Sequence, residues 1–202
     1  MHFTSVDNLA GIAASGGLHA DCVLRGGGVS PTECGDQAVK ERRRGMPVRV
    51  SPAGVVGDYV PFYFAPRSPM LYKIWKGSVA TYQKGQDPLV YMVSSLSTVD
   101  RAGLSWVGSD GNMAVVMTEQ TGEWLRLDQI VDWPLMKARM WNDTENDGDR
   151  MRRRMAELLV HKFFPLDCVE YLVVRTKHTA EAAESCVQGK MQVHVRPEWY
   201  YS

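Results

Sequence analysis

The chain has 202 residues, of which 45% are hydrophobic and 9% aromatic, and its 23 basic and 23 acidic side chains balance each other. This composition excludes a disordered polar tail, and the zero net charge excludes a general electrostatic attraction to nucleic acid. No apolar stretch has the length of a membrane-spanning helix and no signal peptide is evident, so we expect a cytoplasmic protein without membrane contact.

The predicted elements are short and of mixed type. In chain order they are a strand at 1–4, a helix at 6–13, an irregular segment at 26–50 with a short helix at 38–44, strands at 60–64, 89–95 and 104–107, a turn at 108–112, a short helix ending near 141, a polar loop at 142–149, strands at 156–160 and 169–174, a helix at 179–187 and a last strand at 191–195. Pro61 places the strand at 60–64 at a sheet edge. The mixture predicts an α+β class.

Two basic runs, at 40–49 and 150–154, are the local patches that could contact nucleic acid, and acidic residues at 143–149 offset them. The four cysteines have neither paired spacing nor a histidine at metal-ligand spacing: Cys22, Cys34, Cys168 and Cys186. Their pattern predicts reduced thiols, no zinc site and no redox motif.

Arg67 stands alone in the segment VPFYFAPRSPMLY, residues 60–72, in which prolines fix the backbone. One interpretation is a surface arginine that stacks on an aromatic ring for packing, and composition alone favours it. The other is an anion site, because a guanidinium on a rigid turn can hold a phosphate or carboxylate through two parallel hydrogen bonds.

Glu157 lies in the apolar sequence AELLV, residues 156–160, directly after the second basic run. It is either a solvent-facing strand residue whose charge a neighbouring arginine offsets, or a carboxylate at the end of a central strand that stabilises a cationic transition state. The pattern alone does not choose between these interpretations.

His2, Thr4 and Asn8 form a third group, at the N-terminus. The spacing of two puts His2 and Thr4 on one face of the first strand. A histidine near a chain end ordinarily has no special role, but an imidazole beside a hydroxyl offers hydrogen bonds to a ribose and an amide.

Several segments, in this order along the chain, resemble the DarT family of toxins: His2-Phe3-Thr4, Asp7-Asn8-Leu9, Gly16-Gly17-Leu18, Val60–Tyr72, Ser109–Asn112 and Ala156–Val160. The likeness spans nearly the whole chain. The aromatic segment before Arg67 is its most specific part, whereas the His-x-Thr element is shared with many NAD-dependent ADP-ribosyltransferases.

The resemblance implies an ADP-ribosyltransferase fold, in which a central split mixed β-sheet has flanking helices, in one domain over residues 1–202. It implies an enzyme that transfers ADP-ribose from NAD to a base of single-stranded DNA, with thymine as the expected base, and so blocks replication. It also implies a macrodomain antitoxin, DarG, that removes the modification. We expect a monomer that uses NAD as co-substrate and no metal.

By position, the resemblance makes Glu157 the catalytic glutamate and Arg67 the active-site arginine. It assigns NAD binding to His2, Thr4, Asn8, Gly17, Leu18 and Arg67. It assigns DNA binding to Tyr59 and Tyr63 as stacking surfaces, to Asn112, and to Arg153 and Arg154.

Two positions depart from the family pattern. Ser5 stands where many relatives carry a second histidine, and Asn112 stands where many carry a histidine beside the acceptor base, which leaves the details of base recognition open. The alternatives are a transferase acting on guanine, RNA or protein, and a module without catalysis that binds nucleic acid or an antitoxin. Arg67 and Glu157 favour the enzyme, because a binding module needs no isolated acid in that strand.

Overall fold

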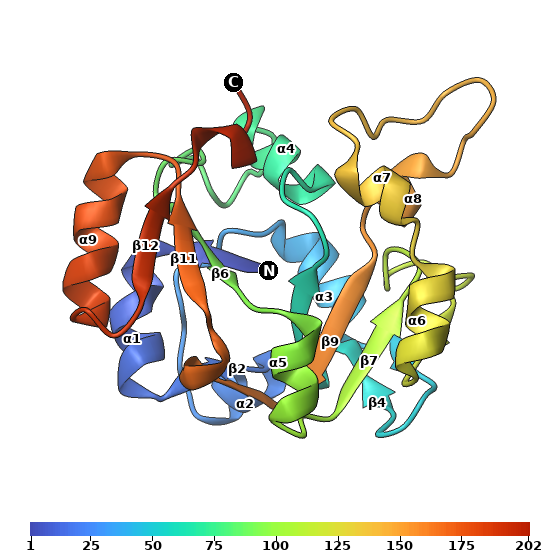
Figure 1. Ribbon diagram of the computed structural model, residues 1–202, viewed down its shortest axis with the longest axis horizontal. Coiled ribbons are helices and arrows are strands. Elements are labelled where there is room, and N and C mark those ends of the chain that lie inside the picture. The colour runs from blue at the N-terminus through green and yellow to red at the C-terminus, as the bar shows by residue number, and fades with distance from the viewer.

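The computed structural model describes residues 1–202 and contains two four-stranded sheets (Figure 1). The first sheet has the order β1 (His2–Ser5), β6 (Leu89–Val93), β11 (Tyr171–Val174), β12 (Gln192–Val195). The second has the order β5 (Tyr59–Tyr63), β9 (Glu157–His161), β7 (Trp106–Ser109), β8 (Gln120–Thr121). Two ribbons pair β2 (Gly17–His19) with β10 (Phe163–Pro165) and β3 (Pro47–Val48) with β4 (Gly54–Val55). The first sheet is mixed, because β11 and β12 run parallel while its other pairs are antiparallel.

The helices are short and flank the sheets (Figure 1). The α-helices are α1 (Leu9–Ala14), α2 (Asp21–Gly26), α3 (Gln37–Arg44), α4 (Pro69–Trp75), α5 (Leu96–Arg101), α6 (Trp124–Ile130), α7 (Trp133–Lys137), α8 (Arg150–Arg153) and α9 (Lys177–Val187). Short 3-10 helices are η1 (Val6–Asn8), η2 (Val56–Asp58), η3 (Leu166–Cys168) and η4 (Pro197–Trp199). None of these helices has the length and apolar character needed to cross a membrane.

The edge strands β1 and β5 bring the two sheets together near the N-terminus, at the centre of Figure 1. The Met1 amine donates to the Tyr63 carbonyl at 2.8 Å, and the Tyr63 N–H donates back to the Met1 carbonyl at 2.8 Å. Pro61 has no N–H to offer a sheet partner, which an edge strand tolerates. The predicted edge position of this strand is confirmed.

The two faces of β9 belong to different hydrophobic clusters. Leu158 and Val160 lie in the largest cluster, of 24 buried residues, whereas Leu159 lies in a small cluster with Tyr59. Because side chains alternate along a strand, Glu157 shares the face of Leu159.

Most predicted strands and helices form within a few residues of their expected bounds, including the strand that begins at Glu157 and the helix before the last strand. The turn predicted at 108–112 is wrong in its first half, because Gly108 and Ser109 continue β7. Gly108 permits close packing instead of a turn: a Cβ there would lie 2.3 Å from Leu127 Cδ1 of α6. The sequence prediction also missed α4, although Ser68 caps its first turn and Pro69 occupies a favourable first position.

Candidate active site

Glu157 is the first residue of β9 and pairs in register with Tyr63 of β5. Its backbone is fixed by Ser109 of β7, whose hydroxyl accepts from the Glu157 N–H at 3.1 Å and donates to the Gly111 carbonyl at 2.8 Å. The Glu157 side chain is 1% exposed, so the interpretation as a solvent-facing strand residue is wrong. No sequence pattern indicated this role for Ser109.

The carboxylate of Glu157 has two different oxygens. Oε2 accepts a hydrogen bond of 2.6 Å from the Arg43 guanidinium, whereas Oε1 is buried and has no partner. Burial raises the pKa of Glu157 above its usual value, and the positive charge of Arg43 opposes this rise. A buried acceptor without a partner carries a free-energy cost that native proteins tolerate mainly at functional sites.

Arg43 belongs to the basic run that the sequence offered for DNA contact, with Arg43 or Arg44 as candidates, and the structure instead pairs it with Glu157. It reaches Glu157 from α3, 114 residues away in the chain. Its neighbour Arg44 instead pairs with Asp21 and Glu41, so one basic run serves separate tasks. One signal was present, because Val39 and Arg43 are four residues apart and so share one face of the helix, where both are half-buried.

Tyr63 lies beside this ion pair, and Tyr59 does not. Burial, and next the charge of Glu157, raises the pKa of Tyr63 to about 12, so its hydroxyl stays protonated. Its ring stacks on Phe3 with centroids 6.3 Å apart. Tyr59 is 2% exposed and donates its hydroxyl proton to the Ala53 carbonyl at 2.7 Å. The prediction that Tyr59 stacks on a DNA base is therefore wrong, because its ring is inside the protein.

Thr4 and Asn8 are hydrogen-bonded to each other and Asn8 to the segment before α3, whereas His2 is bonded to β5. His2 Nδ1 lies 2.9 Å from the Pro61 carbonyl, which can only accept, so Nδ1 carries the proton. Burial lowers the pKa of His2 to about 4, so the ring is neutral and its Nε2 is an acceptor. The Asn8 amide donates to Thr4 Oγ1 at 2.8 Å and exchanges two hydrogen bonds with the Thr32 backbone. These bonds already occupy the Asn8 amide and position Thr4, and the NAD contact of Asn8 stays a prediction.

Gly17 and Leu18 are part of the core. Leu18 is 5% exposed and belongs to the largest hydrophobic cluster. A Cβ at Gly17 would lie 2.2 Å from the Phe164 carbonyl, so glycine allows β2 to approach β10. The Leu18 side chain and Gly17 both serve packing, and their NAD contact stays a prediction.

Arg67 has a backbone φ of +57°, a conformation that is strained for a residue other than glycine. Tyr91 holds it by accepting from its N–H at 3.3 Å, and Tyr201 by donating to its carbonyl at 2.5 Å. The guanidinium lies 4.8 Å from the centroid of the Tyr201 ring, and Nε has no hydrogen-bond partner. The contact with the Tyr201 ring supports the packing interpretation of Arg67, and the unpartnered Nε supports the anion-site interpretation.

Arg67 also lines a cleft of about 560 Å³ that the sequence did not reveal. Lys137 and Arg139, at the end of α7, line the same cleft and are exposed. Neither takes part in an ion pair, and Glu198 is the one acidic side chain among the lining residues. The cleft is therefore lined by more basic than acidic side chains.

Arg153 and Arg154 add little free positive charge to that cleft, although Arg154 is among the residues that line it. Arg154 is 4% exposed and donates to four backbone carbonyls, those of Leu135, Met136, Ala138 and Pro66. Arg153 pairs with three acids, Asp132, Asp147 and Asp149. This geometry does not favour the predicted phosphate contacts, because the Arg154 guanidinium is bonded to carbonyls of α7, Ala138 and Pro66 and the charge of Arg153 is offset by acids.

Asn112 uses its side chain within its own loop. Its Oδ1 accepts from the Ala114 N–H at 2.9 Å, and its Nδ2 lies 3.4 Å from the Met155 sulfur. The predicted contact of Asn112 with a base is therefore not favoured by this geometry, because the amide already stabilises the loop after β7.

The model of the DarT family, described as ssDNA thymidine ADP-ribosyltransferase, matches residues 1–201. The chain belongs to the DarT family. Two relatives named DNA ADP-ribosyl transferase support the assignment across almost the whole chain. The Mycobacterium tuberculosis protein is 37% identical over 206 residues, covering 99% of this chain and 87% of that protein. The Thermus sp. protein is 35% identical over 208 residues, covering 99% and 94%.

Solved DarT structures share the fold of this DarT family member. Thermus sp. 2.9 DarT in complex with ADP-ribosylated ssDNA matches with a TM-score of 0.90 at 34% identity, covering 99% of this chain and 94% of that chain. The same protein in complex with NAD+ matches with a TM-score of 0.86 at 33% identity, covering 99% and 96%. The predicted ADP-ribosyltransferase fold and the predicted class, an NAD-dependent DNA ADP-ribosyltransferase, are confirmed.

Proposed function

We propose that this chain transfers ADP-ribose from NAD to a thymine of single-stranded DNA, with Glu157 as its catalytic carboxylate. One observation carries the assignment of Glu157: it is a buried carboxylate with one oxygen bound by Arg43 and the other without a partner. Family membership supports the reaction, and the relative solved with NAD+ and with ADP-ribosylated ssDNA supports the donor and the acceptor.

Glu157 has the environment that the first half of this reaction requires. Positive charge develops on the ribose as nicotinamide leaves, and a fixed carboxylate stabilises it more strongly inside the protein than in water. The free Oε1 of Glu157 is the oxygen available for this task. Burial raises the pKa of Glu157, and the positive charge of Arg43 opposes this rise and so favours the ionised carboxylate.

The second half requires a base, because a thymine ring nitrogen is a poor nucleophile until it loses its proton. Burial moves the pKa of Glu157 upwards, toward the range in which a carboxylate accepts a proton efficiently. Tyr63 stays a neutral ring and hydroxyl beside Glu157 and can contact the base. The acceptor base must leave its stack to reach this buried site, which favours single strands over duplexes.

His2 and Thr4 are the residues that we assign to NAD. The unprotonated Nε2 of His2 can accept from a ribose hydroxyl, and the Thr4 hydroxyl keeps its own proton to donate because Asn8 is the donor in their mutual bond. Asn8 fixes Thr4 and the Thr32 backbone relative to each other.

We assign the DNA backbone to the cleft lined by Arg67, Lys137 and Arg139. These cations lack carboxylate partners, whereas most other basic side chains near the site are paired within the protein. Few phosphate contacts are then available, so salt should weaken binding with a modest slope.

We further propose that residues 1–202 act as one monomeric domain in the cytoplasm, where NAD and DNA are accessible, and that a DarG-type macrodomain antitoxin removes the modification. Family membership supports this pairing. Thermosipho africanus DarTG in complex with ADP-ribose shares the fold, with a TM-score of 0.80 at 16% identity, covering 99% of this chain and 50% of that chain. Rescue of growth by co-expressed macrodomain tests the pairing.

The central test incubates the protein with NAD and oligonucleotides that differ by one base, and locates the added mass by fragmentation. We expect ADP-ribose on thymine in single strands, little product on the matched duplex, and none with Glu157→Gln. Modification of guanine in thymine-free strands would replace the acceptor but keep the transferase. Full transfer by Glu157→Gln would remove Glu157 from catalysis.

A further inference from the structure

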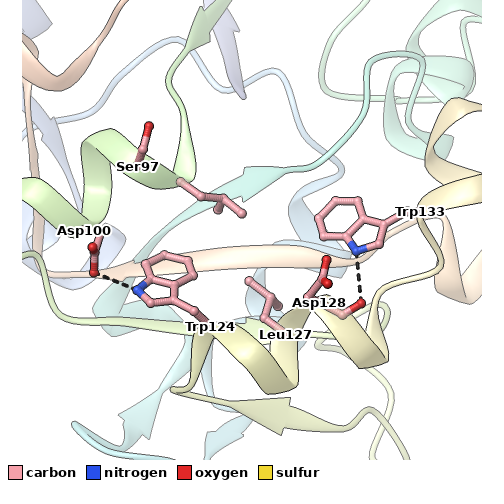
Figure 2. Close-up of a pocket in the computed structure, with 7 residues that line it drawn as sticks. Ser97, Asp100, Trp124, Leu127, Asp128 and Trp133 are labelled. Carbon is pink, nitrogen blue, oxygen red and sulfur yellow. Dashed lines mark hydrogen bonds between the residues drawn. The ribbon is translucent and has the colours of Figure 1, made fainter.

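A second cleft, of about 260 Å³, lies between α5 and α6 at the start of α7 (Figure 2). It is on the opposite side of the second sheet from Glu157. Leu127 at its base packs on Gly108 and belongs to the cluster of Leu158 and Val160, whereas Glu157 shares the other face with Leu159. The cleft is therefore separate from the transferase site.

Two indole rings border this cleft, and both are fixed. Trp124 stacks on Trp106 with ring centroids 3.7 Å apart and donates to Asp100 Oδ1 at 2.7 Å. Trp133 donates to the Asp128 carbonyl at 3.1 Å. Figure 2 shows the Asp128 side chain between the two indoles. Half-buried indoles that are already oriented lose little conformational freedom when a ligand packs on them.

Two carboxylates border the same cleft, and neither has a counter-charge. Asp100 and Asp128 are exposed and take part in no ion pair, although many acids of this chain do. The adjacent Arg101 pairs with neither carboxylate and donates instead to the Ser97 carbonyl and to Thr98. Two unpaired negative charges beside two indoles favour a cation and repel the phosphates of DNA.

We propose that this cleft binds one arginine side chain of a partner polypeptide. A guanidinium is flat enough to stack on an indole and can donate two parallel hydrogen bonds to a carboxylate. The cleft is smaller than the ~300–1,000 Å³ of pockets for drug-sized ligands, so it accommodates a single side chain. Because the cleft and Glu157 lie on opposite faces of the sheet, the partner binds while DNA occupies the transferase site.

The test titrates N-acetyl-arginine amide into the ¹⁵N-tryptophan-labelled protein and follows the indole N–H resonances by NMR. We expect saturable shifts at Trp124 and Trp133, and no shift at Trp75, which is outside the cleft. The matched ligand is N-acetyl-citrulline amide, which has the shape of arginine without its charge. Equal shifts with citrulline would overturn the proposal, and so would tighter binding of spermidine, which would indicate a free polyamine instead.

Asp128→Asn should weaken arginine binding on the order of tenfold, because it removes one charge-assisted contact. Asp128 is exposed and outside the transferase site, so ADP-ribosyl transfer to an oligonucleotide should remain unchanged. Asp100→Asn is the second variant, since an asparagine oxygen can still accept from the Trp124 N–H. Wild-type arginine affinity in both variants, or displacement of the arginine ligand by an oligonucleotide, would refute the proposal without affecting the assignment of Glu157.

Discussion

Replacing Arg43 by methionine removes the counter-charge of Glu157 but keeps a side chain of similar length. The Arg43 side chain is 14% exposed and that of Glu157 is 1% exposed, so the variant leaves a carboxylate that is neither solvated nor paired. Removing one partner of a buried ion pair costs about 3–5 kcal/mol of unfolding free energy. For a domain of this size, that loss lowers Tm by roughly 6–20 °C.

The cost in Arg43→Met depends on pH, because Glu157 can take up a proton. Burial already raises its pKa, and loss of Arg43 raises it further. A folded-state pKa above the unfolded value of about 4.3 means that the folded protein binds the proton more tightly. The stabilisation that comes from this tighter proton binding is fully present below the unfolded pKa and is lost as the pH rises through the folded pKa. The loss is about 1.4 kcal/mol for each pH unit that separates the two pKa values. The deficit relative to wild type should therefore be larger at pH 8 than at pH 5.

Urea unfolding followed by the fluorescence of the six tryptophans measures this deficit at both pH values. Arg42→Met is the matched control: Arg42 is exposed and unpaired, so its loss should change stability by less than about 0.5 kcal/mol. The double variant with Glu157→Gln removes the buried charge and should regain most of the stability at pH 8. An equal deficit at pH 5 and pH 8, or a double variant as unstable as Arg43→Met, would refute the reasoning.

Three further predictions concern other parts of the site. NAD affinity measured by calorimetry should be constant from pH 8 to about 5.5 and fall toward pH 4, because His2 is neutral until the pH approaches its pKa of about 4. His2→Ala should weaken NAD binding. Wild-type NAD affinity in that variant would exclude the contact. Arg154→Met should lower the unfolding free energy by about 3 kcal/mol or more, because four backbone carbonyls lose a charged donor. A stable variant that is defective only in DNA binding would instead support Arg154 as a phosphate contact. Lys137→Met should leave stability unchanged. It should reduce, by about 0.7, the slope of log affinity for a single-stranded oligonucleotide against log salt concentration, as measured by fluorescence anisotropy. An unchanged slope would place the DNA outside this cleft.

The resemblance to the DarT family assigned Glu157 and Tyr63 to the site, without their geometry. Both lie in strands whose apolar residues form continuous runs, so the strands were predictable from composition. That Glu157 and Tyr63 pair across β5 and β9 depends on strand order and register, which no local pattern contains.

The contacts that the structure does not favour have a common physical cause. Tyr59, Leu18 and Arg154 are residue types that can face either solvent or the interior, and the choice depends on what packs against them. Arg154 in particular follows three residues that are solvated or paired at the surface, yet its guanidinium is enclosed by backbone carbonyls from α7 and from Pro66. Basic side chains are seldom buried, so the sequence favoured the surface position.

The sequence by itself determined the strand that carries Glu157, the edge position of the strand with Pro61 and the family, because each depends on residues that are close together in the chain. The tertiary structure alone decided the partner of Glu157. Arg43 comes from a helix 114 residues earlier, and of the basic residues around it only packing determines which one reaches the carboxylate. An ion pair depends on distance in space, and distance in space between remote segments is a property of the folded chain.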